Sequence, residues 1–109
     1  MKIYRQGDVM IRAVAEIPNA AQDVTPKNDR IVLAHGEVTG HAHAIACGEA
    51  REFSFVEAGA AVRRFLSVVS KTGATVRHEE HASIPLPPGA YEIIQQREYT
   101  PESIRNVAD

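Results

Sequence analysis

The histidines are the residues of this chain whose type and spacing are best suited to chemistry. All five lie in one central stretch, at His35, His41, His43, His78 and His81. A neutral imidazole nitrogen is a good ligand for zinc, iron, manganese or nickel. The clustering therefore predicts a site for a divalent transition metal ion, although it does not say which metal.

The pair His41 and His43 has the spacing of two ligands on one β-strand. Side chains two apart on a strand point to the same face, roughly 6.5 to 7 Å apart at the backbone. Imidazoles at that separation can converge on one ion at about 2.0 to 2.1 Å from each nitrogen. Ala42 and Ala44 face the other way and add no bulk, so the pair is predicted to ligate.

The second pair, His78 and His81, needs a different geometry because residues three apart on a regular strand face opposite sides. A turn through Glu79 and Glu80 would bring the two rings together. If a strand instead continues through His78, Glu80 shares its face and becomes the alternative ligand. Both arrangements remain open at this point.

The predicted metal ligands are the histidines of these two pairs, His41, His43, His78 and His81. Whether His35 or Glu49 joins them is open. Three histidines with one carboxylate would leave a coordination position for water or substrate, whereas four would be closer to a closed structural site. In a catalytic site the metal would act as a Lewis acid or lower the pKa of bound water. The candidate bases are Glu49, Glu79 and Glu80.

A second hypothesis belongs to a different class of protein. The histidines would then be surface or structural residues, with the segment 78–81 forming a solvated hairpin tip. The protein would be a non-enzymatic structural or interaction protein that forms a homo-oligomer through exposed strands.

Short strands separated by turn residues must position these side chains. Alternation and β-branched residues predict strands over 2–4, 9–14, 30–35, 41–45, 51–56 and 90–99. Turns are expected at 6–8 and 37–39. Residues 62–69 fit a helix or a strand, and we favour a strand that pairs as a hairpin with 75–78. Three prolines exclude 84–89 from a helix or a central strand, and Thr100 with Pro101 predicts a short helix over 100–107.

Size and composition place these elements in one all-β, mostly antiparallel domain over residues 1–109, a small barrel or sandwich with a short C-terminal helix. The net charge is −2 and no basic stripe is present, which argues against nucleic acid as a partner. Cys47 is the single cysteine, so an intramolecular disulfide is excluded and a buried, inert thiol is expected. Neither a signal peptide nor a membrane-spanning segment is evident, and we expect a cytoplasmic location.

The order of these motifs resembles that of the cupin family, whose small β-barrels carry a first motif with His-x-His and Glu and a second with a further His. The resemblance implies that His41, His43 and Glu49 are first-motif ligands, and that His78 or His81 is the second-motif histidine. Gly59 and the Pro87–Gly89 turn would match the family's glycine and Pro-x-Gly positions. Here the gap to Glu49 is longer than usual, and both later histidines precede the Pro-x-Gly turn. Residues 36–43 are also similar to segments of small bacterial and phage proteins, which implies no function.

Overall fold

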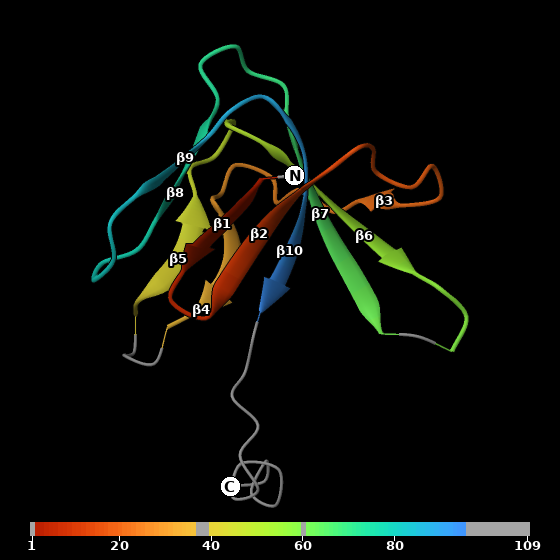
Figure 1. Cartoon of the computed structure of the whole chain (residues 1–109), viewed down its shortest axis with the longest axis horizontal. Helices are drawn as coiled ribbons and strands as arrows, with labels where there is room; N and C mark the ends of the chain where they lie inside the picture. Colours follow the sequence, from red (N-terminus) through yellow and green to blue (C-terminus); the bar gives the residue numbers. More distant parts are fainter. Residues whose placement is uncertain (1, 37–39, 60, 96–109) are drawn as a thin grey trace, which may run out of the picture.

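The regular structure of this protein consists of short β-strands. The computed structural model describes residues 2–36, 40–59 and 61–95 (Figure 1). Its strands, in chain order, are β1 (Ile3–Gln6), β2 (Val9–Val14), β3 (Gln22–Asp23), β4 (Ile31–His35), β5 (Ala42–Ile45), β6 (Arg51–Val56), β7 (Val62–Val68), β8 (Ala74–Arg77), β9 (Ile84–Leu86) and β10 (Gly89–Gln95). No helix in this part of the chain has the length and apolar character needed to cross a membrane.

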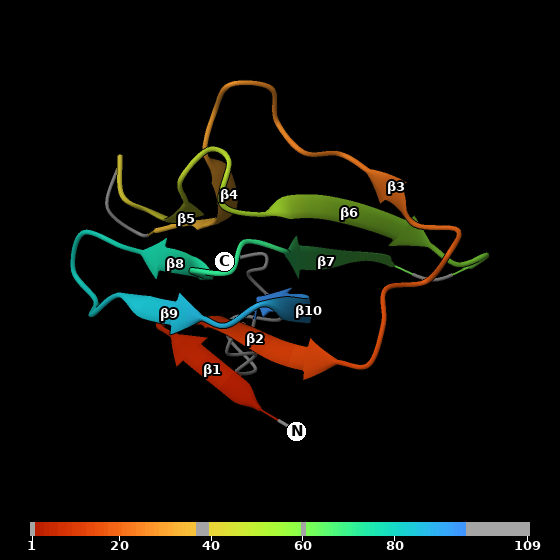
Figure 2. The same cartoon turned by 90° about the horizontal axis from the view of Figure 1, so that it is seen from above.

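The strands form two antiparallel sheets. One has the order β1-β2-β10-β7-β6-β3 and the other the order β4-β5-β8-β9. Viewed from above, β5, β8 and β9 lie to one side and β6 and β7 to the other (Figure 2). Because each sheet keeps two edge strands, the closed barrel was the wrong alternative, and the all-β antiparallel prediction is confirmed.

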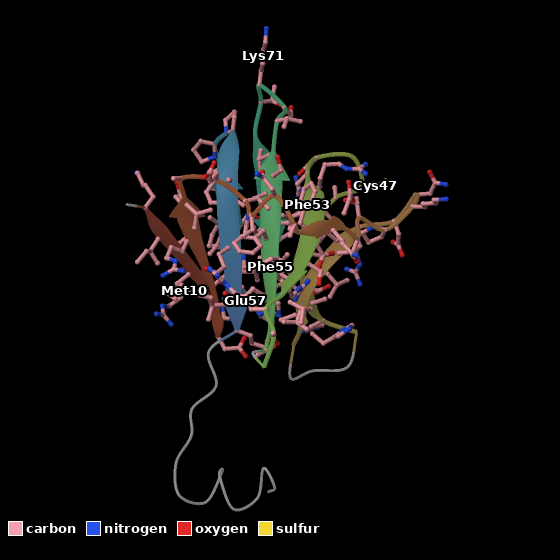
Figure 3. All side chains as sticks on the ribbon, turned by 90° about the vertical axis from the view of Figure 1, so that its right-hand side faces the viewer. Met10, Cys47, Phe53, Phe55, Glu57 and Lys71 are labelled. Atoms are coloured by element: carbon pink, nitrogen blue, oxygen red, sulfur yellow. The ribbon has the colours of Figure 1, made fainter. Side chains whose placement is uncertain are left out.

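The hydrophobic core lies between the two sheets. Side chains two apart on each strand face inward together, as Val9 and Ile11 do on β2 and Tyr91 and Ile93 do on β10. The core also contains the other sheet's Ile31, Leu33, Ile45, Val76 and Leu86. Phe53 and Phe55 of β6 lie on the outer face of the larger sheet (Figure 3).

The Arg64 side chain of β7 connects the two sheets by hydrogen bonds. Its guanidinium donates to the Leu33 carbonyl at 2.6 Å and to the Val32 carbonyl at 2.9 Å. These carbonyls lie where the β4–β5 register shifts, so the ladder there is irregular. The Glu52 carboxylate accepts from the same guanidinium at 2.8 Å and balances its charge.

The strand favoured over 62–69 is confirmed, but the hairpin predicted with 75–78 is wrong. β7 pairs with β6 and β10, whereas β8 pairs with β5 and β9 in the other sheet. The residues between β7 and β8 cross from one sheet to the other, and Gly73 supports the change of direction with a φ of 79°. A turn composition indicates where a chain changes direction, but it does not choose the next strand's partner.

The proline-rich segment forms the edge strand β9, where Pro85 lies opposite Thr75. An edge position tolerates proline because no further strand needs its missing N–H. The exclusion from a central strand is therefore confirmed for 84–88, whereas Gly89 already begins the central strand β10. The turn expected at 37–39, the strand end at 96–99 and the helix expected over 100–107 lie outside the described residues.

Candidate metal site

Four of the five histidines meet at one end of the sandwich, where the β1–β2 turn, the start of β5 and the residues after β8 come together. His43 faces inward from β5 and is 3% exposed. The ring centroid of His78 lies 4.3 Å from that of His43 and 5.8 Å from that of His41. Both members of the His-x-His pair therefore lie near the same third ring, consistent with side chains two apart on an extended segment.

The second pair is also brought together. β8 ends at Arg77, so the strand does not continue through His78, and Glu80 is not placed on a shared strand face. The backbone bends instead, and the ring centroids of His78 and His81 are 4.7 Å apart. His81 also lies 5.8 Å from His43. The four predicted histidines thus form one continuous group of rings, but their binding of a metal ion stays a prediction.

Three side chains converge closely enough to hold one ion. His41, His78 and Glu79 each offer a ligand atom, and these atoms all lie within 4.8 Å of one another. Glu79 is exposed, and its Oε1 accepts the Ala42 N–H at 3.0 Å. That hydrogen bond, with another from its own backbone, holds the pKa of Glu79 below its ordinary value. The carboxylate is therefore ionised and fixed against the start of β5.

One ring nitrogen in this group lacks a hydrogen bond. Nδ1 of His41 is buried and has no hydrogen-bond partner among the described residues. The Glu80 carboxylate is the nearby charged group, but its Oε2 is 3.8 Å away, beyond hydrogen-bond distance. Leaving a buried polar atom without a partner costs roughly 1 to 3 kcal/mol. A metal ion would satisfy this nitrogen.

Gln6 fixes the protonation of the buried ring of His43. Its amide Nε2 donates to the carbonyls of Val76 and Ala82 at 3.2 and 2.9 Å. The Oε1 atom therefore faces Nδ1 of His43, 2.8 Å away, and accepts its proton. In the neutral ring Nε2 then carries the free lone pair, the arrangement in which the outer partner orients a metal-binding imidazole.

The β1–β2 turn closes the other side of the group. Asp8 places Oδ1 3.6 Å from Nε2 of His43. Gly7 has a φ of 60°, and a Cβ there would lie 3.1 Å from both Cε1 of His43 and Nε2 of His81. Any larger residue would strain the backbone and crowd both rings.

The burial of His43 favours the neutral form of its ring. Loss of water around the ring, followed by the proximity of His78, lowers the pKa of His43 below its usual value of 6.5. Asp8 acts in the opposite direction but does not outweigh burial. The ring is therefore neutral at neutral pH and available as a donor of its Nε2 lone pair.

Three other residues singled out from the sequence lie away from the four histidine rings and Glu79. Glu49 follows β5, and its Oε1 accepts the Thr75 N–H at 3.0 Å, which anchors a loop. His35 is exposed at the end of β4. Cys47 is exposed as well, so the expectation of a buried thiol was wrong. Its position in the loop after β5, beyond the last core residue of that strand, accounts for the exposure.

Sequence reasoning missed Gln6 and Asp8, which we interpreted only as turn residues. Their role depends on β1 and β2 lying across from β5 at the same end of the sandwich, a long-range relationship. The one local signal was a glutamine at an inward-facing strand position, where Gln6 is 3% exposed. Buried polar side chains of this kind are usually hydrogen-bonded for a specific reason.

The fold and this end of the sandwich define a small two-sheet antiparallel β protein with a histidine–carboxylate group. The chain belongs to the family described as Domain of unknown function (DUF8820), whose model matches residues 5–96. The match covers every residue of the group and gives no cupin assignment. No curated protein and no solved structure matches the chain significantly.

Proposed function

We propose that this domain binds one divalent transition metal ion through His41, His78 and Glu79. The observation that carries the proposal is the convergence of three ligand atoms to within 4.8 Å of one another. Ligand atoms around a bound zinc ion lie about 3 to 3.5 Å apart, given bonds of about 2.0 to 2.1 Å. Small rotations of partly exposed side chains would close that difference.

The donor set favours an ion with open coordination positions. Two imidazoles and one carboxylate hold zinc in several hydrolytic enzymes and ferrous iron in oxygenases. Either ion would keep at least one position for water or substrate. We therefore favour an exchangeable site over a closed structural one, with zinc, iron, manganese and nickel as the ions to compare.

The remaining two predicted histidines border this set. His43 and His81 contact the ring of His78, at 4.3 and 4.7 Å between centroids. We propose that His43 orients His78, and that His81, which is exposed, borders the site without filling its open coordination position. Residues that orient a metal ligand typically change metal affinity by about 10- to 100-fold.

If the ion activates water, Glu80 is the best placed of the three candidate bases. Its side chain is 59% exposed, so it can move, and its Oε2 lies 3.8 Å from a ring nitrogen of the group. Glu79 would be engaged as a ligand. Glu49 is engaged with the Thr75 N–H, which leaves it no such role.

The direct test is metal titration of the untagged full chain, followed by measurement of bound zinc, iron, manganese and nickel. We expect one ion per chain. Substitution of His41, His78 or Glu79 by alanine should weaken binding by at least about 100-fold, and substitution of His43 by about 10-fold. His35→Ala is the matched control because His35 is exposed outside the group. Substoichiometric metal, or equal loss in the control variant, would contradict the proposal.

The interaction-protein alternative has one observation in its favour. Phe53 and Phe55 lie on the outer face of the larger sheet (Figure 3), and Val56 and Val62 are 62% and 58% exposed at the end of the same hairpin. Such apolar surface is common at homo-oligomer interfaces. Light scattering with and without chelator separates the hypotheses, because a metal-independent oligomer that binds no ion supports only the second.

A further inference from the structure

A pocket on the outer face of the smaller sheet adjoins the metal group. It encloses about 610 Å³, within the range of small-molecule sites. His78 and Glu79 form part of its wall, so a ligand in the pocket would reach an ion held by these two side chains. Ala42, Ala44 and Ala46 also line it. Their methyl groups leave the space that larger side chains would fill.

The register of the sheet places Arg77 beside the strand that anchors Glu79. Ala42 donates its N–H to Glu79, whereas Ala44 pairs with Arg77 of β8. Alternate residues on one strand are separated by about 6.5 to 7 Å. The β5 residue that anchors Glu79 and the β5 residue that pairs with Arg77 are therefore about that far apart along the strand.

The charges of the lining favour an anionic ligand once the ion is bound. Arg30 and Arg77 are opposed in the pocket by two carboxylates, those of Asp29 and Glu79. A divalent ion on Glu79 leaves the pocket with a net positive charge. Arg77 is 58% exposed, and its contact with Glu49 is long at 3.9 Å, so its guanidinium can turn to a ligand.

We propose that this pocket binds a small organic dicarboxylate, with one carboxylate on the metal ion and the other on Arg77. The short carbon chain between them lies along the alanine methyl groups. A planar guanidinium suits this role because it donates two parallel hydrogen bonds to a carboxylate. The proposal rests on the metal site and adds to it the class of ligand.

The test uses the full chain loaded with zinc, with succinate as the probe and its neutral diamide, succinamide, as the control compound. Binding is measured by calorimetry and by amide shifts in NMR spectra. We expect succinate to bind and to shift the amides of Ala42 and Ala44, and succinamide to bind at least about tenfold more weakly. Arg77→Gln should weaken succinate binding by about tenfold or more without changing the metal content.

Two further variants keep the outcome interpretable. Ala46 is exposed in the pocket lining, so Ala46→Leu should block succinate without disturbing the core. Arg51→Gln removes an arginine outside the pocket and should bind succinate like the wild type. Stoichiometric zinc without succinate binding at roughly 10 mM, or equal binding by Arg77→Gln and wild type, would overturn the pocket proposal alone. Absence of zinc binding would overturn the metal site, and the pocket proposal with it.

Discussion

The side-chain amide of Gln6 and the imidazole of His43 are joined by a hydrogen bond of 2.8 Å, although the two residues lie 37 positions apart. The same amide donates to backbone carbonyls of Val76 and Ala82. One side chain from the larger sheet thus holds a ring from the smaller sheet and the segment that carries His78 and His81. Because Oε1 of Gln6 faces the ring and can only accept, Nδ1 of His43 is the protonated nitrogen.

Gln6→Leu should therefore destabilise the fold and remove the hydrogen bond that fixes the protonated nitrogen of His43. It leaves two carbonyls and one ring N–H without partners, and we expect a loss of about 2 to 3 kcal/mol in the free energy of unfolding. Chemical denaturation measures that loss. In ¹⁵N spectra, Nε2 of His43 should appear unprotonated in the wild type and partly protonated in the variant. Gln22→Leu on β3 is the control, because Gln22 is exposed. Equal losses of unfolding free energy in both variants would show that the Gln6 hydrogen bonds do not contribute to stability.

The contrast between His43 and Gln6 shows which parts of the candidate site could be predicted from the sequence. The His-x-His spacing determined that His41 and His43 share a face, because alternation is a local property of any strand. No local rule states that the β1–β2 turn lies opposite β5, so Gln6 and Asp8 could not be assigned to the site. Most strands were predictable for the same local reason, whereas the pairing of β7 with β6 and β10 is a long-range relationship that no local pattern specifies.

Glu79 shows a second limit of reasoning from residue spacing. The two acidic residues between His78 and His81 were weighed as bases or as an alternative ligand through Glu80. The backbone bend after β8 instead directs Glu79 to the Ala42 N–H and into the converging group. A bend of this kind is set by contacts with β5 and Gln6, which residue spacing does not contain.

Metal binding should break the hydrogen bond between the Glu80 N–H and Nδ1 of His78, which is 3.0 Å long. An ion on Nδ1 would take the lone pair that accepts this proton. An ion on Nε2 of the neutral ring would require the proton to sit on Nδ1. The bond is lost in either case, so the segment after β8 must adjust when the ion enters.

We accordingly expect the Glu80 amide to show a large shift and faster hydrogen exchange on addition of zinc. NMR titration of the labelled chain gives both quantities. The Gly73 N–H, which donates to the Ser70 carbonyl at 2.9 Å away from the histidines, provides the internal control. An unchanged Glu80 amide at saturating zinc would exclude His78 as a ligand.

Arg64 should contribute more to stability than a surface arginine. Arg64→Met keeps much of the side-chain length but leaves the Leu33 and Val32 carbonyls and the Glu52 carboxylate without their donor. We expect a loss of about 2 to 3 kcal/mol by chemical denaturation, since hydrogen bonds to a charged group are the stronger kind. Arg51→Met, which removes an exposed pair with Asp23, should have a much smaller effect. Similar losses would mean that the sheets are held by the core alone.

Glu92 should make the stability of the fold depend on pH. Its carboxylate is 7% exposed and lies between Arg12 and Arg63 on the outer face of the larger sheet. Hydrogen bonding from Arg63 is the main cause that lowers the pKa of Glu92 below its ordinary 4.5, and Arg12 adds to it against the effect of burial. Because the folded state favours the ionised form, this stabilisation is fully present above 4.5 and is lost as the pH falls through the lowered pKa.

Glu92→Gln should consequently be less stable than the wild type at pH 7, by about 1 to 2 kcal/mol, because neutral hydrogen bonds replace charge-assisted ones. The difference should stay constant down to about pH 5 and shrink below it, as the wild-type carboxylate takes up its proton and loses the same advantage. Urea denaturation of the wild type and of Glu92→Gln from pH 7 to pH 3 measures this difference in unfolding free energy. Glu16→Gln, at an exposed position, should track the wild type throughout. If the Glu92 difference kept its full size at the lowest pH, packing of the side chain rather than its charge would be the source of the stabilisation.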